Sequence, residues 1–243
     1  DTYANIQAAI ISDAPQAAIA TREVGAQVSA GNIKQLGIKE MIGQGESNFA
    51  GSPQNRIHNI SVAAEKLNGI LIAPGEEFSL VEAIGEVNAE AGYLPELVIK
   101  EKKTIPEYGG GLCQIATTVF RGAMQTGLDI TERQSHAYAV DYYAPQGTDA
   151  TIYIPHPDLR FINDTKDYIL LQSKIEGSTL TFDFYGTNDG RQIELSGPVT
   201  WDHKSDGSLK AKWGQKVTMP DSTVRENEFY SNYKPPAEFH DNN

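Results

Sequence analysis

The stretch GGGLCQIATTVF, residues 109–120, joins three glycines to the only cysteine of the chain and to an apolar, helix-compatible run. From Ile115 onward, apolar residues recur at helical spacing as far as Met124, and Gly127 follows. This spacing predicts a helix of about four turns that a glycine terminates. Cys113 therefore lies in the first turn of the predicted helix.

The position of Cys113 favours a reactive thiol over an inert one. Backbone N–H groups at a helix start lack partners and carry the positive end of the helix dipole, which favours a thiolate. Gly110 and Gly111 let the backbone approach a ligand closely. With the Gln114 side chain, they are candidates to hold an oxyanion. The alternative is a buried structural cysteine, since free cysteine is among the most buried residue types.

A cysteine nucleophile needs a base to accept its proton and a third group to orient that base. Five histidines are available, namely His58, His136, His156, His203 and His240. We favour His136, because it falls in the first predicted strand after the cysteine helix and should pack beside that helix. Asp149 opens the next predicted strand and is the candidate that orients the imidazole. The alternatives are a structural strand histidine and an aspartate that closes a turn.

Cysteine, histidine and aspartate follow one another at separations of 23 and 13 residues. This leaves room for one helix, one strand and one hairpin turn. The order is similar to that in papain-like and, more closely, transglutaminase-like enzymes. We therefore expect a core in which the cysteine helix packs against strands that carry the histidine and the aspartate.

The rest of the chain predicts an α+β fold with helices packed on an antiparallel sheet. Helices are expected within residues 4–20, early in 30–42, and from Ser52-Pro53 to Asn68-Gly69. A strand is expected in the later part of 30–42. Residues 43–52 are expected to form a loop. The remaining strands are expected in pairs or at turns, at 70–72, 97–99 with 103–105, 130–143, 150–154, 168–175 with 179–185, and weakly after residue 189.

Four side chains are candidates for substrate binding near the cysteine helix. Arg56, Arg121 and Arg133 are candidates to hold a substrate carboxylate through paired guanidinium hydrogen bonds, and Tyr142 to line a groove. The alternative is that each arginine is a solvated or structural charge and that the tyrosine belongs to the core. No His, Cys, Asp or Glu cluster has the spacing of a metal site, so we expect neither a metal nor a cofactor.

Composition and charge exclude several classes of protein. Of the 243 residues, 40% are hydrophobic and 21% are charged, which is typical of a globular protein. The formal net charge of −12 argues against nucleic acid as a partner and against adsorption on an anionic membrane. No segment has the length and apolarity of a membrane span, so we expect no membrane insertion. We also expect a monomer.

Several motifs together resemble the VanW domain, over roughly residues 50–186. In the first half these are Asn55-Arg56, Asn59-Ile60, Leu67-Asn68-Gly69, Ile72, Pro74-Gly75-Glu76-Glu77-Phe78-Ser79, Gly85 and Gly92-Tyr93. In the second half they are Gly109-Gly110-Gly111-Leu112-Cys113-Gln114, Thr117-Thr118, Gly127-Leu128, Glu132-Arg133, His136, Gly147 and Asp149-Ala150-Thr151. One departure is Ala137, where the family often has serine.

The resemblance implies three parts and a place in the cell. Residues 1–48 would be the remnant of a preceding peptidoglycan-binding-type domain with its linker, 49–188 the VanW domain, and 189–243 a C-terminal β extension and tail. It implies a bacterial protein on the extracellular face of the cell envelope, and we expect an anchor in a segment outside this sequence.

The resemblance also implies an activity, peptidoglycan cross-linking by L,D-transpeptidation, with Cys113 and His136 at the positions of the family's cysteine and histidine. The partner would then be a peptidoglycan stem peptide, joined through a cysteine thioester. Two alternatives stay open at this point: a cysteine peptidase or amidase of the cell wall, and a non-catalytic module that binds peptidoglycan.

Overall fold

The computed structural model describes residues 2–12, 15–17, 33–100 and 103–238. The chain divides into two units, residues 1–36 and residues 37–243. The first contains helix α1 (Thr2–Ile11) and a 3₁₀ turn, η1 (Ile33–Gln35). The second unit contains all the other helices and strands of the described residues, together with Cys113, His136 and Asp149. The predicted helix within residues 4–20 thus ends at Ile11, before Pro15; residues 15–17 are not helical, and residues 13–14 and 18–20 lie outside the described residues.

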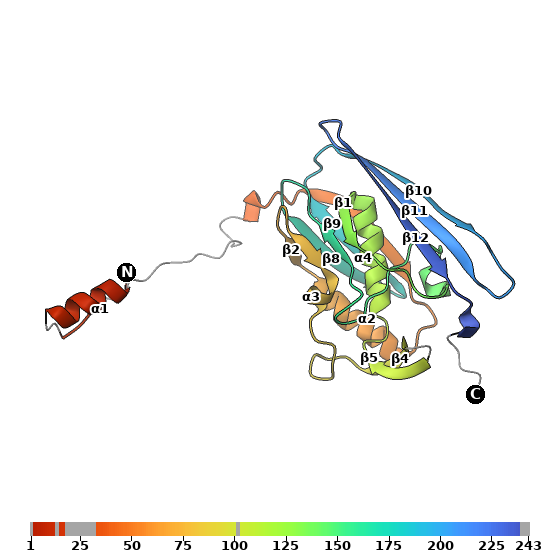
Figure 1. The fold of residues 1–243 in the computed structure, drawn as a ribbon, viewed down its shortest axis with the longest axis horizontal. Helices are drawn as coiled ribbons and strands as arrows, with labels where there is room; N and C mark the ends of the chain where they lie inside the picture. Colours follow the sequence, from red (N-terminus) through yellow and green to blue (C-terminus); the bar gives the residue numbers. More distant parts are fainter. Residues whose placement is uncertain (1, 13–14, 18–32, 101–102, 239–243) are drawn as a thin grey trace. The chain divides into compact units, whose positions relative to one another are not determined.

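Helix α4 (Leu112–Thr126) lies at the centre of the second unit (Figure 1). It begins after Gly111 and ends at Gly127, whose φ of 71° is the left-handed conformation in which glycine closes helices. Twelve of its fifteen residues are buried, which is typical of a helix covered on every side. The sequence-based prediction of this helix, with Cys113 in its first turn, is confirmed.

One face of α4 packs on a four-stranded antiparallel sheet with the order β1-β9-β8-β2. The strands are β1 (Glu40–Asn48), β9 (Thr179–Gly186), β8 (Ile169–Glu176) and β2 (Ile70–Ile72). β9 alternates between buried and partly buried residues along its whole length. The β8–β9 hairpin and the short β2 strand agree with the sequence-based prediction.

Strand β1 corrects the expected loop at residues 43–52, because β1 continues through Asn48. Its glycines lie against the central helix instead of in a turn. A Cβ atom on Gly45 would lie 1.9 Å from the carbonyl oxygen of Thr118 and 2.5 Å from the backbone nitrogen of Gly122. Glycine is needed at this position so that strand and helix can approach each other this closely.

Helix α2 (Gln54–Leu67) follows Pro53, as predicted, and buries one face. The short helix α3 (Leu80–Ile84) begins at Ser79, whose hydroxyl accepts a hydrogen bond from the Glu82 N–H. The predicted hairpin near residue 100 is also present, as β4 (Pro95–Lys100) and β5 (Lys103–Tyr108). β5 leads directly into the glycine run before Cys113.

A small antiparallel sheet has the order β3-β7-β6, formed by β3 (Glu77–Ser79), β7 (Arg160–Ile162) and β6 (Asp129–Glu132). The expectation of one strand over residues 130–143 is wrong in its length. The chain leaves the sheet after Glu132 and ends this stretch in a 3₁₀ turn, η2 (Asp141–Tyr143).

The expected strand at residues 150–154 is likewise reduced to a single bridge, between Thr151 and Gln134. Both stretches have high β propensity, but several backbone groups of the intervening loop bond to side chains instead of to a neighbouring strand, among them those of Asp149 and Arg121.

The C-terminal strands form a second layer over α4 (Figure 1). They are β10 (Gln192–Trp201), β11 (Leu209–Thr218) and β12 (Val224–Tyr233), in the order β10-β11-β12, and the 3₁₀ turn η3 (Pro236–Glu238) follows. Trp213 meets Phe120 of α4 edge to face at 5.5 Å, and the Gln215 amide donates to the Met124 carbonyl at 2.9 Å. The weak strand pattern of this region therefore corresponds to three long strands.

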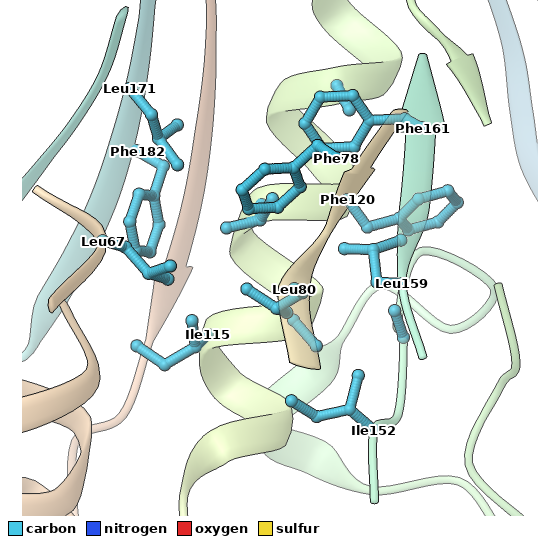
Figure 2. Packing of buried hydrophobic residues seen from close by; sticks show 14 of the residues in the cluster. Leu67, Phe78, Leu80, Ile115, Phe120, Ile152, Leu159, Phe161, Leu171 and Phe182 are labelled. Atoms are coloured by element: carbon cyan, nitrogen blue, oxygen red, sulfur yellow. The ribbon is translucent and has the colours of Figure 1, made fainter. Parts of the chain in front are cut away.

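Buried side chains from all these elements form one hydrophobic cluster. Phe78 of β3 and Phe161 of β7 are cross-strand neighbours whose rings stack with centroids 4.9 Å apart. Figure 2 shows both rings near Phe120 of α4. Together these observations show an α+β fold in which antiparallel sheets and short helices enclose α4. Burial on several sides fixes the axis of α4 and with it the position of its N-terminus.

We predict that Gly45→Ala will lower the free energy of unfolding by at least about 3 kcal/mol, because the new methyl group overlaps the α4 backbone. Urea denaturation followed by circular dichroism measures this change. Gly51→Ala is the control, since a Cβ there meets nothing within 4 Å and the cost is only the strain of φ +78°, about 1 kcal/mol. Equal losses in the two variants would contradict the close approach.

Candidate active site

The half-buried Cys113 is the second residue of α4. The N–H groups of Leu112 and Gln114 on either side donate to the carbonyls of Gly109 and Gly111, at 3.0 and 2.9 Å. In the described part of the chain, the Cys113 N–H has no backbone acceptor outside the helix. It is therefore the donor that the helix start makes available to a ligand at the sulfur.

His136 and Asp149 lie opposite each other, two residues beyond the Gln134–Thr151 bridge. The Asp149 carboxylate oxygen Oδ2 accepts from the backbone N–H of His136 at 2.8 Å and contacts its Nδ1 at 2.7 Å. These two bonds fix the position and the rotation of the imidazole ring. Nε2 is then the ring nitrogen left for Cys113. The two predicted strands are shortened to β6 and a single bridge, yet the predicted pairing of the two side chains is present.

The electrostatics of the three groups favour a thiolate beside an imidazolium. Burial alone would raise the pKa of Cys113, but hydrogen bonding to and the charge of His136 outweigh it and lower the pKa to about 7. Burial alone would lower the pKa of His136, but Asp149 and then Cys113 raise it to about 9. The pKa of Asp149 falls to about 2 despite burial, chiefly through its bond to His136. Asp149 thus remains a carboxylate and supports the charged imidazole.

Thr151 contacts the sulfur directly, with its hydroxyl oxygen 3.3 Å from Sγ of Cys113. The Ile152 carbonyl lies 3.7 Å from the same sulfur. The Thr151 hydroxyl helps to lower the pKa of Cys113, after His136. The motif Asp149-Ala150-Thr151 includes this threonine, but the sequence assigned it no role, because that role depends on the bridge that brings residues 134 and 151 together.

An aromatic ring supports the imidazole from one side. The Tyr143 ring stacks on His136 with centroids 4.3 Å apart and an angle of 17° between the ring planes. Its hydroxyl accepts from Arg56 at 3.3 Å, and burial raises its pKa far above the ordinary value. The tyrosine named in the sequence analysis, Tyr142, instead lies under the Arg56 guanidinium, whose central carbon is 4.3 Å from the ring centroid. Of these two tyrosines, Tyr143 is the one that contacts the triad formed by Cys113, His136 and Asp149.

Gln114 is fully buried, and its amide is occupied inside the protein. Its oxygen accepts from Arg56 at 2.8 Å, and its nitrogen donates to the Ser47 hydroxyl at 2.7 Å. This corrects the expectation that the Gln114 side chain holds an oxyanion. Its contacts instead join α4 to α2 and β1, immediately beside Cys113.

The three candidate arginines are also occupied by internal partners. Arg56 is buried and bonds to Gln114, Tyr143 and the Ser52 hydroxyl. Arg121 donates to the backbone carbonyls of Glu46, Tyr143, Ala144 and Thr148 and to the Thr148 hydroxyl. Arg133 donates to the Asp149 carbonyl at 2.7 Å and to the Asp149 carboxylate at 3.2 Å.

These contacts correct the expectation that the arginines bind a substrate carboxylate. Arg121 and Arg133 hold the loop that ends at Asp149, and Arg56 supports Tyr143. A guanidinium fork that bonds several carbonyls is well suited to this role, because its five donors lie in one plane. Residue type alone cannot separate the two roles, since both need a cation near the site.

Gly110 and Gly111 are needed for packing at the helix start. A Cβ on Gly110 would lie 2.7 Å from Cβ of Glu96, and one on Gly111 would lie 3.1 Å from the carbonyl oxygen of Arg56. Gly111 also has a φ of 113°, and the Gly110 carbonyl accepts from the Asn59 amide at 3.1 Å. The glycine run thus aligns α4 on α2, so that the first turn of α4 can present the Cys113 N–H beside the sulfur.

Fold and site together define an α+β protein with a cysteine, histidine and aspartate constellation at the start of a buried helix. Comparison with known families assigns it more closely. The family described as VanW like protein matches residues 55–185, more than half of the chain. The chain belongs to this family, and Cys113, His136 and Asp149 all lie within the matched region.

Two curated proteins are similar to it. Uncharacterized protein YoaR of Bacillus subtilis (strain 168) is 32% identical over 149 residues, which cover 61% of this chain and 49% of that protein. Vancomycin B-type resistance protein VanW of Enterococcus faecalis (strain ATCC 700802 / V583) is 33% identical over 117 residues, which cover 46% of this chain and 42% of that protein. The chain thus spans less than half the length of each of these relatives.

No solved structure matches the chain significantly. Within the described residues, no helix has the length and apolarity needed to cross a membrane.

We predict that the alkylation rate of Cys113 by iodoacetamide will rise with pH through a midpoint of about 7. His136→Ala should move that midpoint above 9, because burial of the thiol then acts without the imidazole. At pH 7 the thiolate fraction should fall more than about 50-fold, and the rate on the order of 10-fold, because a more basic thiolate is a better nucleophile. His203→Ala, at an exposed histidine, is the matched control. An unchanged midpoint in His136→Ala would contradict the pairing.

Thr151→Val should raise the midpoint of the same alkylation profile, by less than His136→Ala does, because it removes only one hydroxyl contact to the sulfur. Thr151→Ser keeps the hydroxyl and should restore a profile close to that of the unaltered protein. If serine and valine behave alike at this position, the hydroxyl has no influence on the thiol.

Proposed function

We propose that this protein is a cysteine acyltransferase that acts on peptidoglycan stem peptides. The observation that carries the proposal is the position of His136 between the other two residues. Its Nδ1 contacts the Asp149 carboxylate, and the imidazole lowers the pKa of Cys113 through a hydrogen bond and its positive charge. This is the arrangement of nucleophile, base and orienting group on which acyl transfer by cysteine depends. In this respect the core is papain- or transglutaminase-like, with the nucleophile at a helix start.

In the first half of the reaction, the Cys113 thiolate attacks the carbonyl carbon of a donor stem amide and forms a tetrahedral intermediate. The oxyanion accepts a hydrogen bond from the Cys113 backbone N–H at the positive end of α4. The imidazolium of His136 gives its proton to the leaving amine, the C–N bond breaks, and a thioester remains on Cys113.

In the second half, the amine of an acceptor stem attacks the thioester carbonyl. Neutral His136 accepts the proton of that amine, and the new amide forms as the C–S bond breaks. Cys113 leaves as a thiolate and the imidazolium is restored. Asp149 stays ionised throughout, because its pKa lies near 2. The cycle needs no metal or redox cofactor to balance its atoms and electrons.

The choice of substrate rests on the family and on one relative. The name of the Enterococcus relative describes a vancomycin resistance protein. Peptidoglycan stem peptides supply both an amide carbonyl for the donor and a side-chain amine for the acceptor. The proposal therefore includes a location on the outer side of the bacterial cell envelope, where such a substrate would be found.

Incubation of the purified protein with defined muropeptides tests the proposal. We predict cross-linked dimers by mass spectrometry, and a covalent adduct on Cys113 when the acceptor is left out. Cys113→Ala should abolish both products, since no other residue in the chain carries a thiol. Cross-linking that persists in Cys113→Ala would overturn the proposal. Trimmed stems in place of dimers would show that water is the acceptor and that the protein is a peptidase.

A further inference from the structure

The last strand of the protein reaches the candidate triad from outside the region that defines the family. Tyr233 ends β12, and the family match ends at residue 185. The Tyr233 side chain is 1% exposed and extends into the loop that precedes Asp149. Its hydroxyl oxygen accepts from the Gly147 N–H at 2.7 Å and donates to Oδ1 of Asp149.

The two carboxylate oxygens of Asp149 have separate tasks. Oδ2 binds the backbone N–H and the Nδ1 of His136, at 2.8 and 2.7 Å. Oδ1 binds the Tyr233 hydroxyl and Nη2 of Arg133, the latter at 3.2 Å. The group that orients the imidazole is therefore oriented in turn by one phenol and one guanidinium.

Arg133 depends on the same strand. Its Nη2 donates to the Ser231 hydroxyl at 3.0 Å, and its Nη1 donates to the Tyr230 carbonyl at 3.2 Å. The Arg133 side chain is 2% exposed, so water cannot easily replace these partners. Both groups that hold Oδ1 thus take their positions from β12.

The direction of the Tyr233 hydroxyl bond is fixed by its surroundings. The ionised Asp149 carboxylate can only accept, so the phenol donates to its Oδ1, while the phenol oxygen accepts from the Gly147 N–H. Burial and the negative charge of Asp149 both raise the pKa of Tyr233 far above its ordinary value. The phenol therefore remains a donor over the pH range in which Cys113 titrates.

We propose that Tyr233 is a positioning residue of the active site, which sets the orientation of Asp149 and through it that of His136. The C-terminal sheet is then part of the catalytic machinery, and the family-matched region alone lacks one of the donors that hold its aspartate. This inference rests on the proposed function, because a positioned imidazole matters for catalysis only if Cys113 is a nucleophile.

Tyr233→Phe in the whole chain tests this inference, because it removes only the hydroxyl. Tyr230→Phe is the matched control, because it removes a hydroxyl that bonds to the surface residue Glu228 on a side chain that is 61% exposed. The backbone carbonyl of Tyr230, which accepts from Arg133, is kept in this variant. Ser231→Ala is a second variant, which removes a hydroxyl that contacts both groups on Oδ1, the Arg133 guanidinium and the Tyr233 phenol.

Two measurements separate positioning from general stability. The first is the pH profile of Cys113 alkylation by iodoacetamide. The second is the low-field proton NMR signal of the His136 Nδ1–H, which reports its bond to Asp149 without any need for a reactive thiol. In Tyr233→Phe we expect alkylation at pH 7 to slow about tenfold, since a misplaced base is costly. The Nδ1–H signal should broaden or shift upfield, whereas Tyr230→Phe leaves both measurements unchanged.

A Tyr233→Phe variant that melts at a lower temperature but keeps the alkylation profile and the Nδ1–H signal would overturn the inference. If Tyr233→Phe does not fold, Ser231→Ala decides instead: a smaller shift of the same kind supports the inference, and no shift overturns it. Failure of the proposed function would give a different result from failure of this inference. In that case the unaltered protein alkylates with an ordinary thiol profile, while the Nδ1–H signal still responds to the loss of the phenol.

Discussion

The structure depends on the close contact between strand β1 and helix α4. A Cβ on Gly45 would lie within 2 Å of the Thr118 carbonyl oxygen, so the strand backbone lies directly against the helix backbone. On the other side, Trp213 and Gln215 of the C-terminal sheet contact the same helix. A helix held between two sheets cannot shift along its axis without opening both interfaces, and its first turn is fixed as a result. Because Cys113 lies in this first turn, the position of its thiol is fixed as well.

A second constraint is the burial of charge near this helix start. Asp149 is 1% exposed, and a buried carboxylate is costly unless every lone pair finds a donor. Arg133 and His136 provide those donors from one segment of the chain, and Tyr233 provides another from the C-terminal strand β12. The charge that the carboxylate brings is what keeps the imidazole protonated, and the imidazole in turn keeps the sulfur ionised. Reactivity and the packing of distant segments are thus parts of one network.

The same network explains why the arginines serve the scaffold. Arg121 bonds to four backbone carbonyls around residues 46 and 143–148, which belong to a strand, a 3₁₀ turn and a loop. The loop between His136 and Asp149 has little regular secondary structure, so its carbonyls need donors from side chains. Substrate recognition by these cations would require breaking those bonds. The sequence pattern of arginines close to a cysteine helix was compatible with both roles, and the carbonyl partners decide between them.

The sequence by itself determined the features that arise from neighbouring residues. The glycine run, the apolar spacing after it and Gly127 predicted α4 and the placement of Cys113, because helix signals act over a few residues. The order of cysteine, histidine and aspartate also predicted which side chains would meet. Only the tertiary structure decided the rest. It buries Gln114, brings Thr151 to Cys113 and Tyr143 to His136, and places the Tyr233 hydroxyl on Asp149. Those contacts join residues up to 84 positions apart, and sheet register and close packing, which no local pattern encodes, determine them.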